Sequence, residues 1–415
     1  MLGLPLVGGC FSLALFNGFI DPFGLRRWVA MPGINAIKIA ESDHRRLIKA
    51  YRVRQVEPKG LILGTSVSEG GVDPQHPGWP ARARPVYNAS IPYANAYELL
   101  RYFQHAVSCG DVAVAVVGLD FVSFNAYLKN SPDFSEARLA MDVRGRRTRP
   151  PWDEELSMLL SLDASRMSWR TLRGQNNAKP FLRQDGMQTG RMSDADTATP
   201  MRDRFLLMEH EYIHFMWRHG PDRTFALVDE RTGRSYAGAL QAMLEQANRS
   251  GVQLHLVFSP LHARLMIAID RLGWWPEFEE WKRMVARLVD QANLTRPEGP
   301  GIDLWDFADF NELTTESVPG PGSTALMENY YDAAHYTRAA GNRILDKVFR
   351  TATSETLELV APSNVEQHLQ AVASRKKTYE LSHTEDVAEI ADLVRMRPGD
   401  DMHGRIQDLL AKRGL

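Results

Sequence analysis

Residues 60–66 have the sequence Gly-Leu-Ile-Leu-Gly-Thr-Ser, a short apolar run that ends in a turn of small residues carrying hydroxyl groups. The segment after it, through Gly70, Gly71 and Pro74, contains too much glycine and proline to continue as a strand. In an open parallel sheet, ligands bind beyond the carboxyl ends of the strands. We therefore expect Ser66 to lie at the end of a buried strand, where it can meet a ligand.

Other apolar runs indicate further strands of the same sheet. Residues 111–119 and 252–258 are almost entirely apolar, as expected of strands buried on both faces. Segments with helical periodicity separate the runs, among them residues 96–107 and 235–250. The alternation predicts an α/β domain over residues 59–350, with a mainly parallel sheet between two layers of helices, that is, a three-layer α/β/α arrangement.

The N-terminus has a different character from this domain. No charged residue occurs from Leu2 to Ile20, and about 20 apolar residues are enough for one membrane crossing. We expect residues 1–24 to form an N-terminal transmembrane anchor, with a buried helix or a cleaved signal peptide as the alternatives. The nearest basic residues, Arg26 and Arg27, follow the apolar run, so the charges give no support for an N-terminus on the inner side.

Three further regions flank or interrupt the domain. Residues 25–58 are mixed and charged, and we expect a juxtamembrane connector there. The segment from about 130 to 204 is rich in arginine, proline and polar residues, which predicts an insertion or lid that is partly disordered. Residues 351–415 are charged and helix-forming, which predicts a helical C-terminal tail.

Composition excludes several classes of protein. The chain has 415 residues and a formal net charge of −2, and it lacks the concentrated basic face of a nucleic-acid binder. Its two cysteines, Cys10 and Cys109, cannot form a disulfide framework or a cysteine metal site. No cofactor is expected from the sequence.

A second polar motif precedes the last helix predicted for the domain. Asp332 and His335 stand three residues apart, a spacing that lets the carboxylate orient or stabilise the imidazole. A serine at a strand end, together with a distant Asp-x-x-His pair, has the composition of an activated nucleophile. We therefore predict that Ser66, His335 and Asp332 are catalytic.

With these residues in place, the chain from about Gly60 to Phe349 resembles the SGNH (GDSL-like) hydrolase superfamily. It looks closest to the membrane-anchored periplasmic branch that includes alginate O-acetyltransferase-like proteins. Four short blocks carry the resemblance: Gly64-Thr65-Ser66, Asn88-Ala89-Ser90-Ile91-Pro92-Tyr93, Gly118-Leu119-Asp120-Phe121 and Asp332-Ala333-Ala334-His335.

The resemblance implies a flavodoxin-like sheet and a serine-dependent O-acyl esterase or acyltransferase, with acetyl as the expected acyl group. Ser66 would be the nucleophile. Tyr93 stands where the family usually has a glycine that supplies an oxyanion N–H, and Asp120 replaces the oxyanion asparagine. A charged carboxylate there would repel the oxyanion, and loss of one donor costs about 3–4 kcal/mol. Either Asp120 is protonated, or Asn95 or Asn125 donates in its place, or activity is weak.

The resemblance also implies partners and a location. The substrate would be an acylated polysaccharide of the cell envelope or an exported one, and a membrane acyltransferase is a possible partner. The protein would cross the bacterial inner membrane once, with its main domain in the periplasm. His262, which follows a predicted strand end, could line the same cleft as Ser66.

Two alternatives remain open from the sequence. The first is a catalytically degenerate scaffold that binds a glycan or a membrane partner, which Asp120 favours. The second is a zinc hydrolase, because His210-Glu211-Tyr212-Ile213-His214 fits the His-Glu-x-x-His pattern. No clear third ligand follows it, with His219 and Glu230 as the candidates, and the surrounding apolar residues are typical of a helix packed on a core.

Overall fold

The computed structural model describes most of the chain. The described residues are 3–26, 30–142, 145–148, 152–176, 179–189, 199–220, 224–296, 299, 301–351, 360–361 and 363–396. Five strands form one sheet, and every neighbouring pair is parallel. Their bounds are β1 Gly60–Leu63, β2 Val86–Asn88, β3 Val114–Leu119, β4 Gln253–Phe258 and β5 Asp303–Asp306. The α/β class predicted from the alternating pattern is confirmed.

The strand order across the sheet is β2-β1-β3-β4-β5. This is the doubly wound order in which the chain turns back between β1 and β3, and ligands bind beyond the carboxyl ends of the strands at that point. In the pairing of β1 with β3, Leu63 lies opposite Val117, so Thr65 and Asp120 leave the sheet side by side. The topology therefore brings two of the sequence blocks to one edge.

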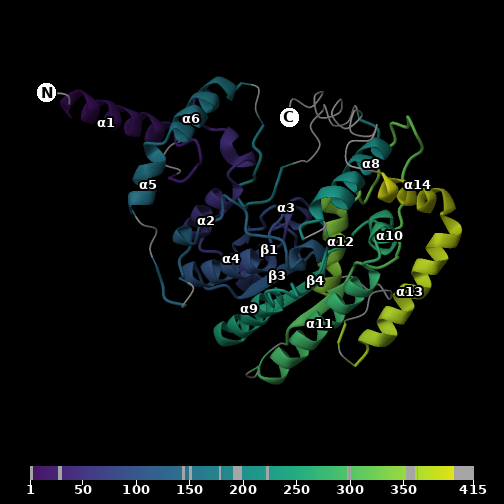
Figure 1. Ribbon diagram of the computed structural model, residues 1–415. Coiled ribbons are helices and arrows are strands. Elements are labelled where there is room, and N and C mark those ends of the chain that lie inside the picture. Colours follow the sequence, from purple (N-terminus) through teal and green to yellow (C-terminus); the bar gives the residue numbers. More distant parts are fainter. Residues whose placement is uncertain are drawn as a thin grey trace.

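Helices follow the strands in the order expected of crossover connections. They are α2 Arg45–Val56, α3 Ser66–Gly71, α4 Ala96–Cys109, α9 Ala237–Ser250, α10 Ala263–Arg271, α11 Trp275–Leu294 and α12 Arg338–Val348. Helices α2, α4, α9 and α11 pack in a row, whereas α3 packs on α12 (Figure 1). All residues of β1, β2 and β3 are buried, so protein covers both faces of the sheet.

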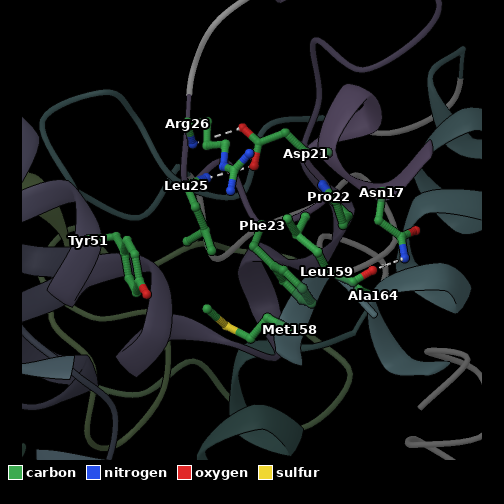
Figure 2. A pocket seen from close by; sticks show the side chains of 11 residues that line it. Asn17, Asp21, Pro22, Phe23, Leu25, Arg26, Tyr51, Met158, Leu159 and Ala164 are labelled. Atoms are coloured by element: carbon green, nitrogen blue, oxygen red, sulfur yellow. Dashed lines mark hydrogen bonds between the residues drawn. The ribbon is translucent and has the colours of Figure 1, made fainter. Parts of the chain in front are cut away.

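The N-terminal helix α1 (Gly3–Ile20) projects from the body and packs near its C-terminal end against α5 (Trp152–Leu159) and α6 (Leu162–Gly174) (Figure 1). Asn17 of α1 is buried, and its amide donates to the carbonyl of Leu159 at 2.7 Å. Figure 2 shows a cavity at this junction, with side chains of α1, α2, α5 and α6 around it. Within the described residues, no helix is long and apolar enough to cross a membrane.

The segment predicted as a lid contains ordered helices. Besides α5 and α6 it leads into α8 (Met201–Glu211), and a turn from Leu182 to Gln188 closes on itself by an antiparallel bridge. That turn docks on the domain, because Asn88 N–H donates to Asp185 O at 2.8 Å. Residues 190–198 lie outside the described residues, so the expectation of disorder there is untested.

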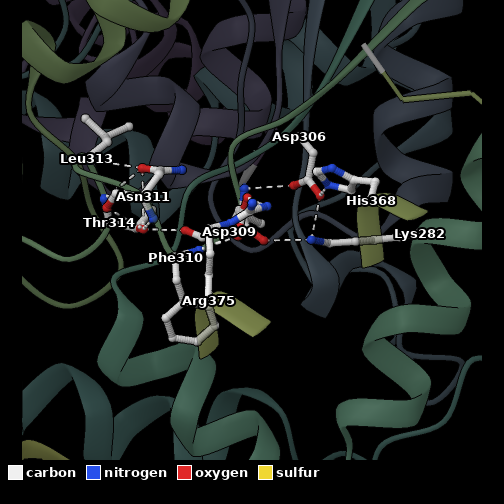
Figure 3. Close-up of polar contacts among 10 residues, drawn as sticks. Lys282, Asp306, Asp309, Phe310, Asn311, Leu313, Thr314, His368 and Arg375 are labelled. Carbon is white, nitrogen blue, oxygen red and sulfur yellow. Dashed lines mark hydrogen bonds and ion pairs between the residues drawn. The ribbon is translucent and has the colours of Figure 1, made fainter. Parts of the chain in front are cut away.

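The C-terminal tail packs on the domain as far as it is described, and residues 397–415 lie outside that part. Helix α13 (Val365–Ser382) lies along α11, and α14 (Thr384–Arg395) lies against α8 and α10. The guanidinium of Arg264 is fully buried and donates to Glu209, Asp386 and Glu389, which links α10 to α8 and α14. Figure 3 shows a second set of polar contacts, in which His368 of α13 reaches Asp306, the last residue of β5, and Arg375 of α13 reaches Asp309 just after that strand.

Candidate active site

Ser66 is the first residue of α3, directly after the turn that leaves β1. Thr65 caps the helix, because its hydroxyl accepts the N–H of Val67 at 3.3 Å. The turn needs glycine: a Cβ on Gly64 would lie 2.3 Å from Oγ of Ser68, and one on Gly118 at the end of β3 would lie 2.2 Å from the same atom. Two glycines at neighbouring strand ends therefore let α3 approach the sheet and leave Ser66 half-buried at its edge.

The structure brings Ser66, His335 and Asp332 together. The hydroxyl oxygen of Ser66 lies 3.0 Å from Nε2 of His335, although the two residues are 269 positions apart. On the other side of the ring, Nδ1 lies 2.8 Å from each carboxylate oxygen of Asp332. This is the connectivity of a nucleophile, a general base and an orienting acid.

The carboxylate of Asp332 fixes both the loop and the ring. Its Oδ1 accepts the backbone N–H groups of Ala334 and His335, each at 2.9 Å. A carboxylate at Nδ1 favours the tautomer with a proton there, which leaves Nε2 free to accept a proton from Ser66. The three groups are therefore arranged for transfer of the serine proton to His335.

Close packing of α3 on α12 fixes the position of Ser66 relative to His335. A Cβ on Gly341 of α12 would lie 1.8 Å from the carbonyl oxygen of Gly71, the last residue of α3. A Cβ on Gly71 would lie 2.0 Å from the ring of Tyr336, which follows His335. Glycine at both positions lets the helix bearing Ser66 meet the segment bearing His335 without an intervening side chain.

Asn88, at the end of β2, supports the serine from the other side. Its buried amide donates to the carbonyls of Ser68 and Val72 at 2.9 and 3.0 Å, and its Oδ1 accepts the N–H of Ser90 at 3.1 Å. One side chain thus ties α3 to the segment that follows β2. Asn88 begins the second of the four blocks that carry the resemblance, but the sequence gave it no role. Its contacts indicate that it positions α3 relative to the segment after β2.

Tyr93 lies on that segment, which borders the Ser66 turn because the N–H of Ile91 donates to the carbonyl of Gly64 at 3.0 Å. Its φ of 55° is left-handed, a conformation that favours glycine and is costly for tyrosine. The phenol holds it there by donating to the carbonyl of Met216 and meeting the ring of His219. Burial raises the pKa of this phenol above its ordinary value, so it stays protonated.

Asp120 follows β3 and is buried beside the Ser66 turn. The hydroxyls of Thr65 and Ser259 lie against its carboxyl, but neither carboxyl oxygen has a hydrogen bond of good geometry among the described residues. Burial raises the pKa of Asp120 above its ordinary value, and the two hydroxyls and the Thr65 N–H offset only part of this effect. No cation among the described residues lies against Asp120 to favour its charged form, so the net effect of the surroundings is toward the neutral acid.

The two asparagines considered as substitutes for Asp120 are occupied elsewhere. Asn95 caps α4 by accepting the N–H of Glu98 at 2.9 Å, and its amide donates to Asn130 Oδ1 at 2.9 Å. The amide of Asn125 donates to the carbonyl of Trp217 at 2.9 Å. Both are fully buried, and their contacts are those of structural residues.

His262, which was expected to line a cleft with Ser66, has a buried side chain. Its ring is buried between Phe205 and Tyr330, and its Nε2 lies 2.7 Å from the carbonyl of Glu316. Burial lowers the pKa of His262 to about 3, which keeps the ring neutral. Its backbone N–H donates to the carbonyl of Ala333 at 3.2 Å, so His262 supports the loop between Asp332 and His335.

His210 and His214 also have structural contacts. Their ring centroids are 4.6 Å apart at the junction of α8 with the π-helix η5 (Tyr212–Met216), and Nε2 of His214 lies 2.9 Å from the carbonyl of Leu393. Of the candidate third ligands, His219 contacts Tyr93 and Glu230 is exposed. Among the described residues, no group of three or more histidine, cysteine or acidic side chains could hold a metal ion.

Sequence reasoning missed Ser259, whose hydroxyl faces Asp120. Ser259 directly follows β4, as Ser66 and Asp120 follow β1 and β3, and that shared place after a strand is the signal that could have identified it.

No known protein family matches the chain, and no curated protein is detectably similar to it in sequence. The geometry of the site therefore carries the functional argument.

Proposed function

We propose that this protein is a serine-dependent O-acyl esterase or acyltransferase with an SGNH-type fold, acting on an acylated polysaccharide. The observation that carries the proposal is the continuous chain from Ser66 Oγ through His335 to Asp332, with separations of 3.0 and 2.8 Å. It lies at the edge of the sheet where the strand order reverses, which is where α/β proteins bind ligands.

In the proposed reaction, Ser66 Oγ attacks the carbonyl carbon of the ester while Nε2 of His335 takes the hydroxyl proton. Asp332 stabilises the imidazolium that forms. The tetrahedral intermediate collapses when His335 returns the proton to the leaving alcohol, which leaves an acyl group on Ser66. Water or a sugar hydroxyl then repeats the sequence in reverse and regenerates the serine.

Two backbone N–H groups are proposed to bind the oxyanion. The N–H of Ser66 lies in the first turn of α3, which has no acceptor within its own helix. The N–H of Tyr93 comes from the left-handed residue where the resemblance expects a glycine, and a backbone donor survives that exchange. Strain at such a position, held by the phenol contact with Met216, is typical of functional sites.

Asp120 fits the proposal in its neutral form. A protonated carboxyl does not repel a developing oxyanion, and it can donate a hydrogen bond as an asparagine amide would. Burial, which raises the pKa of Asp120, supports this state, and the other engagements of Asn95 and Asn125 leave it as the better candidate of the three.

The proposal is tested by hydrolysis of a simple aryl acetate. Wild-type protein should turn the ester over, and Ser66→Ala should abolish turnover while the circular dichroism spectrum and the unfolding midpoint stay unchanged. Ser68→Ala, two residues along α3, is the matched serine control and should retain activity if it folds. Wild-type protein that is inert toward a panel of acyl esters would refute the catalytic assignment.

A second candidate function is a catalytically degenerate scaffold that binds a glycan or a membrane partner. Asp120 favours it, because a carboxylate that ionised during turnover would oppose the oxyanion. Polysaccharide binding that survives Ser66→Ala, with no turnover by the wild type, would support the scaffold over the enzyme.

For location, we propose attachment to the bacterial inner membrane through residues 1–24, with the α/β domain in the periplasm. The uncharged run from Leu2 to Ile20 supports attachment. If the reaction is transfer, a membrane acyltransferase that supplies acyl groups is the proposed partner and a sugar hydroxyl is the acceptor. If the reaction is hydrolysis, water is the acceptor.

A further inference from the structure

The outer part of α1 stands clear of the rest of the described protein. Gly9, Cys10, Phe11 and Ser12 are all exposed, although they occupy every side of the helix. Further along, Phe11, Leu15 and Phe19 form one stripe with exposed fractions of 65%, 57% and 58%. A helix that is apolar on all sides is normally buried in a protein core or in lipid. We therefore expect the exposed turns of α1 to be covered by one or the other.

The opposite side of α1 is bound to α6 by polar contacts. Asn17 points away from the stripe, donates to Ser165 Oγ at 3.0 Å and accepts from Ser168 Oγ at 2.9 Å. These contacts are buried, so they fix α6 beside the C-terminal half of α1. Whatever surrounds the outer turns of α1 therefore begins close to α6.

Helix α6 carries a second line of exposed residues. Leu162, Arg166, Trp169 and Arg173 follow one another at spacings of three and four, so they share one face. Leu162 is 87% exposed and Trp169 is 53% exposed. The guanidinium carbon of Arg173 lies 4.6 Å from the centre of the Trp169 ring.

The charges on this line are uncompensated. Neither Arg166 nor Arg173 forms an ion pair within the part of the chain that the structure describes, and both are exposed. Tryptophan prefers the interface between membrane and water, where its ring is apolar and its N–H is hydrated. Arginine beside it attracts anionic headgroups.

We propose that α6 is a membrane-interface helix, which lies in the headgroup layer of an anionic bilayer while the outer turns of α1 enter the hydrocarbon. The inference rests on the proposed membrane attachment of residues 1–24 and adds α6, from the 130–204 insertion, as a second contact. Leu162, Arg166, Trp169 and Arg173 are the residues that meet the headgroups, and Phe11 and Leu15 are the residues that meet acyl chains.

The positions of the exposed residues favour a bilayer over a protein partner. The α1 stripe faces away from α6, because Asn17 on the other side meets α6. The α6 line lies opposite the buried side of α6, which carries Ala164, Ser168 and Thr171. A protein docking on one side would cover only one of these surfaces, whereas a bilayer surrounds a projecting element on all sides.

The distribution of exposed apolar side chains supports the same conclusion. Of the eleven large hydrophobic residues that are exposed in the described part of the chain, six lie on α1, α5 and α6. They are Phe11, Leu15, Phe19, Leu156, Leu162 and Trp169. The other five are scattered over the rest of the protein, as single exposed apolar residues commonly are.

The test is flotation of the full-length protein with vesicles of phosphatidylcholine, with and without phosphatidylglycerol. Arg166→Glu/Arg173→Glu should weaken binding to the anionic vesicles by about 25-fold or more, because each basic residue near such a surface contributes about fivefold. Leu15→Asp should weaken binding to both kinds of vesicle by about 100-fold, since a charge would have to enter hydrocarbon.

Matched controls separate the surface from general effects of charge. Arg231→Glu/Lys377→Glu makes the same change in net charge at exposed positions elsewhere, and Leu381→Asp replaces a leucine that is 72% exposed on α13. Both controls should bind like the wild type. The circular dichroism spectrum and the unfolding midpoint of every variant, compared with wild type, report that the domain remains folded.

Three results would overturn the inference. Wild-type protein that does not float with either vesicle would remove the membrane contact altogether. Arginine variants that bind anionic vesicles like the wild type would show that α6 does not contact the membrane. Leu15→Asp that leaves vesicle binding intact but abolishes self-association would identify a second copy as the occupant. Vesicle binding without ester hydrolysis would instead refute the proposed function and leave this inference standing.

Discussion

Two pairs of aspartate and histidine lie at the carboxyl-end edge of the sheet, and they differ in what the histidine ring can do. In one, Asp332 contacts Nδ1 of His335 at 2.8 Å, and Nε2 of the same ring faces the half-buried hydroxyl of Ser66. In the other, Asp306 contacts Nε2 of His368 at the same distance, and the ammonium of Lys282 lies 2.7 Å from the same carboxylate oxygen (Figure 3). The first pair can pass a proton, whereas the second is a closed ionic cluster that holds α13 on the domain.

The two buried carboxyls that follow β3 and end β5 differ in the same way. Among the described residues, Asp120 meets hydroxyls and an N–H, and burial outweighs them and raises its pKa. Burial would also raise the pKa of Asp306, but Lys282 and His368 together outweigh it and leave that pKa below the ordinary value. A cation within contact distance therefore accounts for the opposite directions of the two pKa shifts, raised for Asp120 and lowered for Asp306.

The largest expected difference is in catalysis. His335→Ala should lower kcat for an aryl acetate by about 10⁴-fold or more, because the serine loses its base. His368→Ala should leave kcat within about twofold, since the ring touches no residue of the proposed site, although it should loosen α13. Steady-state kinetics and limited proteolysis of both variants check this. A His368→Ala variant as inactive as His335→Ala would mean that the two pairs are not separate in function.

The next effect is on stability. Lys282→Met should lower the free energy of unfolding by about 3–5 kcal/mol, because it leaves the Asp306 carboxylate buried without its main partner. Denaturant titration measures the loss, and adding Asp306→Asn should recover part of it. Activity per folded molecule should not change. Equal free energies of unfolding for Lys282→Met and the wild type would show that the cluster does not stabilise the fold.

The smallest effect at neutral pH is that of Asp120→Asn, and it appears in the pH profile. Neutral Asp120 stabilises the fold below the pKa of the unfolded chain, and this contribution is lost as pH rises through the raised folded pKa. The asparagine variant should therefore become more stable relative to wild type as pH increases. If the neutral acid also serves the oxyanion, Asp120→Asn should lose the alkaline decline of kcat/KM. A profile identical to that of the wild type would exclude the second role.

Much of the fold was predictable because each strand and helix is consistent with its local sequence. The apolar runs at 60–63 and 252–258 and the helical periodicity at 96–107 and 235–250 gave elements close to those observed. The runs did not give the strand order, which depends on packing between distant segments. The helix α6 was also missed, because its exposed face carries apolar residues where a soluble helix has polar ones.

The site was predictable in part for a related reason. Ser66, Asp332 and His335 stand at turns next to predicted elements, and their residue types and places predicted their pairing, which the resemblance supported. The states of Asp120 and His262 depend on what surrounds them: hydroxyls and no cation for the first, two aromatic rings and a carbonyl for the second. Such surroundings come from three or four separate segments, and no local pattern records them.

The most direct test of the central claim is intact-protein and peptide mass spectrometry after brief exposure to an aryl acetate. The account predicts one added acetyl group, located on the peptide that contains Ser66, which is absent in Ser66→Ala and strongly reduced in His335→Ala. The same label in His368→Ala would confirm that the second aspartate–histidine pair has no part in it. No label on the wild type under conditions of active turnover, or a label on another residue, would contradict the account.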